Sequence, residues 1–316
     1  MPLFPYGVRI IGIGSYLPGH IRTNAEISNL VETDDEWIQS RTGIAERRIA
    51  KAGEETSDLA VQAANKALED AGVRPHGIDL IIVATATPDM VFPSTACLVA
   101  RAIGAPKAAA FDLSAACSGF VYSLVTAAGM MGPGGYRRAL VIGAETLSRI
   151  TDWTDRTTCI LFGDAAGAVV LERCDEGHGL LAWELGSDST GADLLSVPPP
   201  HRKIQQNGRE VFKFAVVTVA ESVTRVAEMA GLGVADIDWI VPHQANTRIL
   251  DAASKRLNIP LERMYSNLRR VGNTSAASVP VALADMRREG LLEAGQLVMF
   301  TGFGGGLTWA SALFRW

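Results

Sequence analysis

The sequence predicts a duplicated α/β fold. The first sign is an internal repeat, in which AGLGVADIDWIVPHQAN at 230–246 aligns without a gap on AGVRPHGIDLIIVATAT at 71–87. Each copy follows a pattern of apolar residues at helical spacing and ends in an apolar run typical of a strand buried on both faces. A helix followed by such a strand is an α/β unit. We therefore expect two related halves, residues 1–176 and 177–316.

Composition and charge exclude several classes of protein. With 48% hydrophobic residues the chain can bury a sizeable core, while a net charge of -5 argues against a general binder of nucleic acids or membrane surfaces. No apolar run approaches the roughly 18 residues that a membrane-spanning helix needs. The start of the chain, MPLFPYGVRIIGIG, does not read as a secretory signal. We expect a soluble, cytoplasmic protein that binds neither nucleic acid nor membrane.

The first elements are a strand and two short helices. Gly7–Gly14 has the pattern of a strand, but its continuation lacks the third glycine of a dinucleotide-binding fingerprint. Two capping boxes, Thr23–Glu26 and Thr33–Glu36, each predict a helix start. The second helix carries Trp37 and Arg41 on one face. That pair is either a surface cation–π contact or part of a sandwich for a planar ring such as adenine.

Helices and strands alternate further along the chain. A helix is expected from Ser57 to a stop at Gly72, followed by a buried strand at 78–85. In the second half, LVMFTGFGG at 297–305 is the expected counterpart of LVIGAETLS at 140–148. Between the halves, residues 193–208 include three consecutive prolines and predict a loop without a core pattern.

Cys117 is the candidate nucleophile. The stretch 108–129 reads as a strand, a tight turn and a helix that is apolar nearly all round and is expected to be buried; its counterpart at 273–286 has no cysteine. A thiol at the first turn of such a helix tends toward thiolate, which predicts a lowered pKa. The alternative is a small buried hydrophobe. The other cysteines form no CxxC pair or disulfide framework, favour a reducing compartment, and are interpreted as structural: Cys97, Cys159 and Cys174.

Three further strand-end features point to the same place. His243 follows an apolar strand, and Asn273 opens the helix that is equivalent to the one after Cys117. The glycine-rich stretch 301–306 lacks the Lys-Ser/Thr of a phosphate-binding loop, but it allows backbone N–H groups to approach a ligand, as an oxyanion hole requires. Taken singly, His243 is a structural histidine and Asn273 a helix cap. Because the duplication brings these loops to one cleft, a catalytic set is favoured.

Motifs along essentially the whole chain resemble one known family. They are GIGSYLP (12–18), TNAE (23–26), DEWIQSRTGI (35–44), FPSTAC (92–97), AACSGF (115–120), FGDAAGA (162–168), NGREVFK (207–213), PHQANTRI (242–249), GNTSAAS (272–278) and GFGGGLTW (302–309). Together they closely resemble the β-ketoacyl-acyl carrier protein synthase III family of the thiolase superfamily. A thiolase would show a second active-site Cys, an elongating synthase a second His in place of Asn, and a hydroxymethylglutaryl-CoA synthase an acidic base. The resemblance implies a duplicated, five-layered αβαβα thiolase-like fold and an acyltransferase that initiates fatty acid biosynthesis.

The resemblance also implies a two-stage decarboxylative Claisen condensation. Cys117 would attack a short acyl-CoA starter while the N–H groups of Cys117 and Gly306 hold the oxyanion. His243 and Asn273 would then hold the thioester oxygen of malonyl-acyl carrier protein. Loss of CO2 gives an enolate that attacks the acyl group on Cys117, and the product is a 3-ketoacyl-carrier protein. No cofactor and no metal are implied.

Binding residues are implied in the same way. Trp37 and Arg156 would flank the adenine of coenzyme A, with Arg41 and Asn246 beside them. Phe92 would line the acyl pocket of the neighbouring subunit in a homodimer. A local basic patch would let a chain of net charge -5 dock an acidic carrier. The expected contacts of the acyl carrier protein are Gln244, Ala245, Asn246, Thr247, Arg248, Lys255 and Arg256.

Two alternatives stay open at this stage. One is an acyltransferase or starter synthase of the same superfamily in secondary metabolism, and the other is a non-catalytic scaffold, which the intact Cys–His–Asn set disfavours. The 193–208 loop is a few residues shorter than the family pattern, and Gln206 stands where an apolar residue is common. Both lie near the expected acyl pocket, so the sequence does not fix the starter chain.

Overall fold

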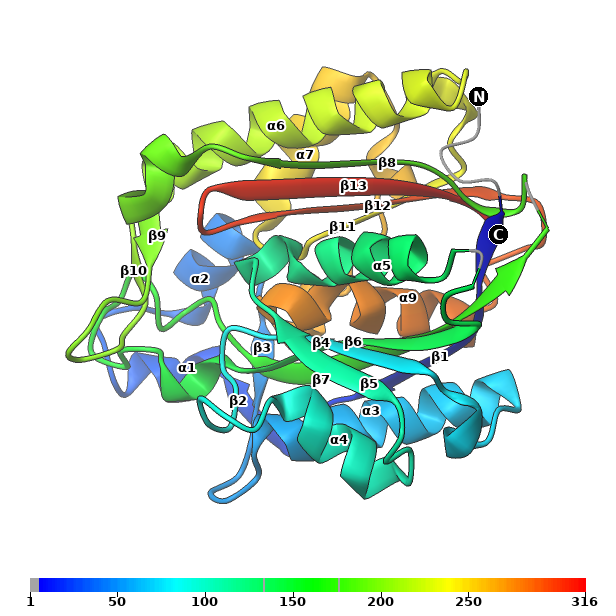
Figure 1. The fold of residues 1–316 in the computed structure, drawn as a ribbon. Coiled ribbons are helices and arrows are strands. Elements are labelled where there is room, and N and C mark those ends of the chain that lie inside the picture. Colours follow the sequence, from blue (N-terminus) through cyan, green and yellow to red (C-terminus); the bar gives the residue numbers. More distant parts are fainter. Residues whose placement is uncertain (1–5, 133, 176) are drawn as a thin grey trace.

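The chain folds into five stacked layers in the order helix, sheet, helix, sheet, helix (Figure 1). The computed structural model describes residues 6–132, 134–175 and 177–316, so the first five residues of the predicted N-terminal stretch lie outside the described part. The layer order is the predicted αβαβα arrangement, and the predicted fold class is confirmed. Within the described ranges, no helix is both long and apolar enough to cross a membrane.

Each sheet layer is built mainly from one half of the chain. One sheet has the spatial order β5 (Ala109–Leu113), β4 (Leu80–Ala84), β6 (Arg138–Thr146), β7 (Asp164–Cys174) and β1 (Gly7–Tyr16). The other has the order β8 (Gly179–Ser187), β13 (Thr308–Arg315), β12 (Leu297–Gly304) and β11 (Trp239–Pro242). A pairing of β1 with β8 at Val8 and Gly179 links the two sheets into one nine-stranded order. The boundary between the halves at 176/177 stays a prediction.

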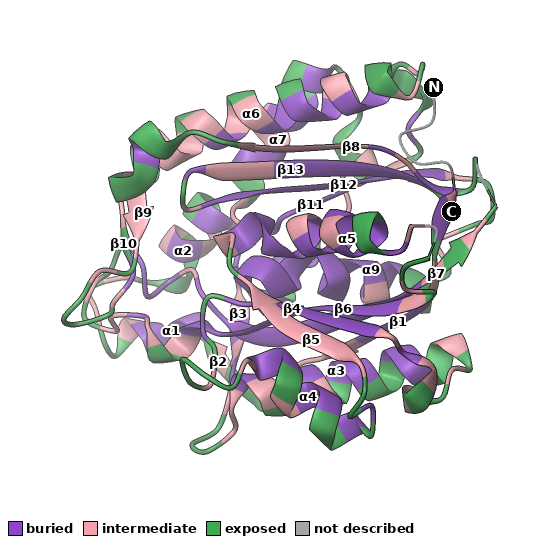
Figure 2. Cartoon of the chain, viewed as in Figure 1, coloured by how far each residue is buried: buried purple, intermediate pink, exposed green. Residues whose placement is uncertain are grey.

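Helices fill the space between the sheets and cover their outer faces (Figure 1). The middle layer consists of α5 (Gly119–Met130) and α9 (Ser278–Arg288). One outer face carries α3 (Thr56–Ala71) and α4 (Thr95–Ile103), and the other carries α6 (Gly208–Met229) and α7 (Thr247–Leu257). As Figure 2 shows, α5 and α9 are largely buried while the outer helices each expose one side. Because α5 lies between the two sheets, the helix has few polar side chains.

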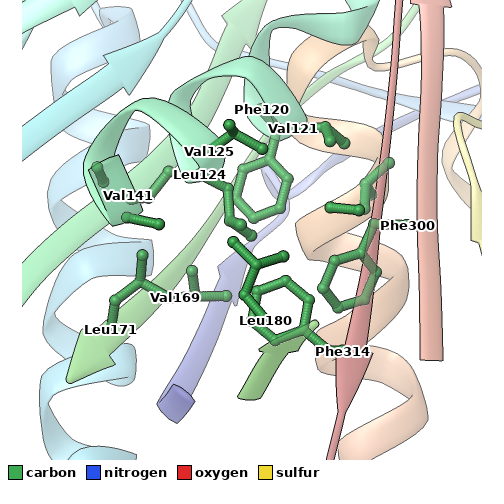
Figure 3. Close-up of a cluster of buried hydrophobic side chains, with 14 of the residues drawn as sticks. Phe120, Val121, Leu124, Val125, Val141, Val169, Leu171, Leu180, Phe300 and Phe314 are labelled. Carbon is green, nitrogen blue, oxygen red and sulfur yellow. The ribbon is translucent and has the colours of Figure 1, made fainter. Parts of the chain in front are cut away.

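The main core forms where α5 contacts both sheets. Phe120 and Leu124 of α5 point toward Val141 of one sheet and toward Phe300 and Phe314 of the other (Figure 3). All five side chains are at most 1% exposed, and burying each aliphatic or aromatic side chain contributes about 1.5–3 kcal/mol. The start of α5, where the candidate nucleophile lies, is therefore fixed by packing from both halves of the chain.

The strand register shows how the halves correspond. Leu80 of β4 pairs with Ala139 of β6, and Trp239 of β11 pairs with Val298 of β12. Trp239 comes 159 residues after Leu80, and Val298 comes 159 residues after Ala139. This spacing is the offset of the internal repeat. The predicted match of 140–148 with 297–305 was therefore wrong by two residues. Continuous apolar runs carry no periodicity that fixes their register. The prediction aligned the two segments on the Leu-Val pair with which each begins, and this alignment is displaced by two residues.

The first short helix begins as predicted and the second does not. The capping box of Thr23 and Glu26 starts α1 (Asn24–Ser28), and the N–H of Thr23 donates to Glu26 at 2.7 Å. In α2 (Asp35–Thr42) the cap is Asp34, whose carboxylate accepts from the N–H of Trp37 at 2.7 Å. The predicted box Thr33–Glu36 was wrong because the stronger aspartate cap lies one residue later. A two-stranded antiparallel sheet flanks these helices and is formed by β2 (His20–Thr23) and β3 (Glu46–Ile49).

The predicted helix 57–72 is confirmed as α3, which ends at Gly72 with φ +62°. The segment 193–208 is more ordered than expected, because β9 (Leu195–Ser196) pairs with β10 (Gln205–Gln206) and Ile204 is buried. The expectation of no core pattern was wrong here, since two-residue strands are too short to leave a periodic signal. A further short helix, α8 (Leu268–Val271), precedes the Asn273 loop.

Candidate active site

Two matching turns contact each other between the sheets. The turn Ala116–Ser118 leads into α5, and the turn Ser275–Ala277 leads into α9. Each begins with a residue other than glycine in the left-handed region, at φ +45° for Ala116 and +48° for Ser275. Such a backbone costs about 1–3 kcal/mol and is found most often at functional sites. The paired turns therefore mark this place as the candidate site.

Glycines on the strands behind the turns permit this close packing. A Cβ on Gly143 of β6 would lie 2.2 Å from the carbonyl oxygen of Ala276. A Cβ on Gly302 of β12 would lie 3.0 Å from the Cα of Ser118. The two glycines hold equivalent positions in the two halves, so each turn lies directly on the backbone of the strand next to it.

The Cys117 thiol is buried, with 8% of the residue exposed. Burial raises the pKa of Cys117 to about 12, although hydrogen bonds from the Ser275 side chain and from the Cys117 N–H act to lower it. The nearby Glu145 carboxylate raises the pKa of Cys117 further. The predicted lowered pKa was therefore wrong for the free protein. The desolvation that comes with a buried helix start outweighs the helix dipole, and the resting sulfur is a thiol.

Asn273 is held so that its amide can donate. Its backbone N–H donates to the Leu161 carbonyl at 2.9 Å, and its own carbonyl accepts from the N–H of Gly163 at 2.9 Å. Its side-chain Oδ1 accepts from the N–H of Ser275 at 2.9 Å. Because Oδ1 is occupied in this way, the Nδ2 group is the part of the amide left to donate a hydrogen bond.

His243 is buried and neutral. Burial lowers the pKa of His243 to about 3, and the residue is 1% exposed. Its Nδ1 lies 2.7 Å from the hydroxyl of Ser278, and its ring packs edge-on against Phe303 at a centroid distance of 5.1 Å. Nε2 is therefore the ring nitrogen left for a ligand.

Cys117 lines two cavities. The first has a volume of about 120 Å³ and is lined by Cys117, His243 and Asn273 together with Phe212 and Gln206. The second has a volume of about 300 Å³. Its lining is mostly apolar: Ala86, Leu147, Ile150, Phe162, Leu195, Val197 and Ile204. The structure therefore brings the predicted Cys, His and Asn to one cavity and adds a second cavity that Cys117 also lines.

The glycine-rich stretch runs beside the nucleophile. A Cβ on Gly304 would lie 2.7 Å from the backbone nitrogen of Cys117, so only glycine fits there. Gly306 lines the second cavity together with Cys117, and its φ of +142° is one that glycine adopts readily. This close approach suits the predicted oxyanion hole, whose donors stay a prediction.

The predicted coenzyme A residues form one cluster at the surface. The Arg156 guanidinium lies 4.7 Å from the centroid of the Trp37 ring, and that of Arg41 lies 5.9 Å from it. Asn246 caps α7 through its Oδ1, while its Nδ2 donates to the carbonyl of Arg41 at 2.9 Å. Asn246 also lines the 120 Å³ cavity, which connects this cluster to the catalytic residues.

The predicted carrier-protein residues are only partly available. Thr247 and Arg248 are exposed at the start of α7, and Ala245 is half-buried. Lys255 and Arg256 are also exposed, and each is paired with an acidic side chain, Asp251 at 2.7 Å and Glu221 at 3.6 Å.

Gln244 departs from the prediction. It is fully buried, and its amide donates to the carbonyls of Pro242 and Tyr265, at 2.8 and 3.1 Å. Its Oε1 accepts from the hydroxyl of Ser266. A docking protein would not reach this side chain, so its prediction as a carrier contact was wrong. Gln244 instead holds the loop after β11 in place.

Phe92 lies on an exposed apolar loop. It is 82% exposed, next to Val91 at 86% and Met90 at 46%. It does not line either cavity of its own chain. Large apolar side chains that are exposed together mark a surface that another molecule covers.

Sequence reasoning missed three polar residues at the site. Ser275 begins the second turn, Ser278 lies 2.7 Å from His243 Nδ1, and Glu145 is the next-to-last residue of β6, near both turns. A correct register for the repeat would have placed Ser275 opposite Ala116. Nothing in the local sequence signals that Glu145 is buried, because carboxylates at strand ends are common.

Two family profiles match the chain. The profile described as 3-Oxoacyl-[acyl-carrier-protein (ACP)] synthase III covers residues 111–189, and its C-terminal companion covers residues 227–316. The β-ketoacyl-[acyl-carrier-protein] synthase III of Desulfitobacterium hafniense (strain Y51) is 51% identical, over 98% of both chains. That of Geobacillus kaustophilus is also 51% identical, over 98% of this chain and 99% of the relative.

Solved structures agree with these matches. The 3-oxoacyl-[acyl-carrier-protein] synthase III of Aquifex aeolicus VF5 superposes with a TM-score of 0.96 at 46% identity, covering 98% of this chain and 100% of its own. The priming β-ketosynthase of the R1128 polyketide pathway gives a TM-score of 0.93 at 37% identity, covering 99% and 97%. The predicted family and enzyme class are confirmed: the chain belongs to the β-ketoacyl-acyl carrier protein synthase III family of thiolase-like acyltransferases.

Proposed function

We propose that the protein initiates fatty acid biosynthesis by condensing a short acyl-CoA starter with malonyl-acyl carrier protein. One observation carries this proposal. Cys117, His243 and Asn273 line one cavity, and Cys117 also lines a second, mostly apolar cavity. The first cavity suits the thioester arms of the two substrates, and the second suits the acyl chain. The family assignment supports the same reaction.

In the first stage the Cys117 sulfur attacks the thioester carbonyl of the acyl-CoA. The carbonyl oxygen becomes negatively charged and is held by the backbone N–H groups of Cys117 and Gly306. Backbone donors that are already in place need no reorganisation as the charge develops. Coenzyme A leaves, and the acyl group stays on Cys117 with its chain in the 300 Å³ cavity.

In the second stage His243 and Asn273 hold the thioester oxygen of the malonyl group. To donate to that oxygen, His243 carries its proton on Nε2, and its Nδ1, which lies 2.7 Å from the Ser278 hydroxyl, then accepts from that hydroxyl. Asn273 donates through Nδ2. Neutral donors stabilise the enolate that loss of CO2 creates, and each contributes about 3–4 kcal/mol. The enolate carbon then attacks the acyl carbonyl, giving a 3-ketoacyl-carrier protein.

The surface residues fit the same proposal. Trp37 and Arg156 would separate to admit the adenine of coenzyme A between them, with Arg41 and Asn246 beside it. Arg248 would meet the carrier protein or its phosphate at the mouth of the cavity. The exposed Phe92 would reach the acyl cavity of a second subunit in a homodimer. The reaction requires no cofactor, and we place it in the cytoplasm.

One observation favours a second candidate function. The solved priming β-ketosynthase belongs to a polyketide pathway and shares 37% identity with this chain. The 50–51% identities are to proteins named as synthase III, so we place the chain in primary metabolism. The test is incubation of malonyl-acyl carrier protein with each of a series of starters, from acetyl-CoA to branched and longer acyl-CoAs, followed by mass measurement of the carrier. A 3-ketoacyl adduct supports the proposal, while an acyl adduct alone or no adduct overturns it.

A further inference from the structure

The site leaves one proton without an acceptor. Cys117 is a thiol at rest, so it must lose its proton before or during attack on the acyl-CoA. His243 is the obvious base, but its donor role requires a proton on Nε2 while Nδ1 accepts from Ser278. An imidazole in that form has no nitrogen left to accept the proton. Another group near the sulfur must therefore take it.

Glu145 is a buried carboxylate that the condensation does not use. It is fully buried at the end of β6, and it accepts hydrogen bonds from the hydroxyl of Thr87 at 2.7 Å and from the N–H of Ala86 at 3.1 Å. A third contact comes from the hydroxyl of Thr85 at 3.3 Å. Among the described residues, no lysine or arginine forms an ion pair with it. A buried carboxylate that has hydrogen-bond donors but no cation is suited to accept a proton.

Ser275 connects this carboxylate to the nucleophile. The turn that begins at Ser275 packs against β6, which carries Glu145, and against the turn that carries Cys117. The Ser275 backbone is held at φ +48°, and its N–H is already used by Asn273. Ser275 lines the 300 Å³ cavity beside Cys117, and its side chain acts to lower the pKa of both Cys117 and Glu145. The strained turn therefore places a hydroxyl-bearing residue between the strand of Glu145 and the turn of Cys117.

We propose that Ser275 and Glu145 form a proton relay for Cys117, an inference that rests on the proposed acyl-transfer function. The thiol proton moves to Ser275 Oγ as the Ser275 proton moves to the Glu145 carboxylate. The sulfur uses its freed electron pair to bond the acyl carbon. The bond from that carbon to the sulfur of coenzyme A breaks, and the departing sulfur takes the proton back by the same route. Overall, the Cys117 thiol and the thioester of the acyl-CoA are converted into a thioester on Cys117 and the thiol of coenzyme A.

The groups around Glu145 determine the expected pH dependence. They are hydroxyl and N–H groups of the 85–87 segment, Ser275, the Ala276 backbone and the Cys117 thiol. β7 contributes Ala165 opposite Glu145, and the neighbouring Asp164 bonds elsewhere, to Ser148 and the N–H of Ala50. Burial raises the pKa of Glu145 to about 7. Acylation should therefore speed up as the pH rises through about 7, because only the carboxylate form accepts the proton.

The experiment compares three variants, Glu145→Gln, Ser275→Ala and His243→Ala, with a matched control. Asp164→Asn is the control, because it neutralises another fully buried carboxylate in the adjacent strand. Two rates are measured from pH 5.5 to 9. One is alkylation of Cys117 by iodoacetamide, read by intact mass, and the other is single-turnover acylation by acetyl-CoA. Glu145→Asp serves as the conservative rescue, and thermal melting reports folding.

The relay predicts that Glu145→Gln and Ser275→Ala slow both rates by about 100-fold at pH 8, the size of a general-base contribution. Both variants lose the rise through pH 7, while Glu145→Asp restores part of it. Asp164→Asn leaves alkylation within about twofold of the wild type, and His243→Ala keeps the rise of the alkylation rate through pH 7.

Either of two results would overturn the relay. In one, Glu145→Gln alkylates at the wild-type rate and keeps the wild-type pH profile. In the other, His243→Ala removes the rise with pH, which makes histidine the base. Failure of the proposed function looks different, since the wild type would then make no 3-ketoacyl product whatever the alkylation rates are.

Discussion

The two turns at the site have the same backbone and different chemistry. Ala116–Ser118 and Ser275–Ala277 start at nearly the same left-handed φ, lie on a glycine of the adjacent strand and open the two helices of the middle layer. The residues that differ are the reactive ones. Cys117 stands where the second half has Ala276, and Glu145 stands where it has Gly304.

This difference shows how a duplicated fold divides a reaction between its halves. In the proposed reaction the first half supplies the nucleophile Cys117, while the second half supplies the donors His243 and Asn273, which line the same cavity. Gly304 has no side chain because the backbone of Cys117 occupies that space. The equivalent space in the first half holds the Glu145 carboxylate. One backbone frame, used twice, therefore places complementary groups on opposite sides of the same cavity.

Removing the nucleophile should give the largest effect. Cys117→Ala makes the first turn resemble the second, where alanine already occupies the equivalent position, so we expect the variant to fold. It should form no acyl-enzyme with acetyl-CoA and no 3-ketoacyl product, because Cys117 carries the only sulfur that lines the two cavities among the described residues. Intact-mass measurement after incubation with acetyl-CoA checks this. An acetyl adduct on the variant, in the amount found on the wild type, would contradict the assignment.

Changing the second half should separate the two stages. Asn273→Ala should slow condensation by about 100- to 1,000-fold, the cost of losing one such donor, while acylation of Cys117 stays within about twofold. Asn273→Asp is the comparison variant: it keeps an oxygen that accepts from Ser275 but replaces the Nδ2 donor by a charged carboxylate oxygen, so it should also lose condensation. Single-turnover acylation and steady-state condensation are measured in parallel. Equal losses in both stages would show that the halves do not divide the reaction as described.

The glycines behind the turns test the shared frame. Gly143→Ala should destabilise the protein by about 3 kcal/mol, because its Cβ would press against a backbone oxygen that cannot move away; Gly302→Ala, with a looser contact, should cost about 1 kcal/mol. Gly129→Ala is the control, since its Cβ would meet nothing within 4 Å. Chemical denaturation measures all three. A control as unstable as Gly143→Ala would remove the steric explanation.

Much of this comparison could be predicted from the sequence, and the reasons for the failures are physical. The repeat and the residues Cys117, His243 and Asn273 were identified because motifs at strand ends are local. The sequence did not predict that Cys117 is protonated, since the desolvation that raises its pKa depends on every group packed around the sulfur. The burial of Gln244 and that of Glu145 also depend on contacts that are remote in sequence, such as those with Tyr265 and Thr87.

Burial of His243 should be visible in the pH dependence of stability. The folded protein holds this ring neutral down to a pKa of about 3, whereas the unfolded chain protonates it near 6.5. Stability is therefore lost as the pH falls below 6.5. Between pH 7 and 4.5 the wild type should lose about 3 kcal/mol more than His243→Gln, because the other titrating groups are common to both. Urea denaturation at the two pH values measures the difference, and equal losses would mean that the ring is solvated.

The smallest predicted effect concerns the surface of the second half. Arg248 is exposed at the start of α7, with its guanidinium 5.8 Å from the ring of Phe212, which lines the 120 Å³ cavity. Arg248→Glu should raise the KM for malonyl-acyl carrier protein about tenfold and leave the KM for acetyl-CoA within about twofold, because a reversed charge at the rim repels an acidic partner. Lys255→Glu on the same helix is the control, with a smaller expected effect because Lys255 is already paired with Asp251 and lies farther along α7. The tenfold difference should shrink in high salt, since exposed charges are screened. If both variants raise the two KM values equally, the surface beside the cavity does not select the carrier protein.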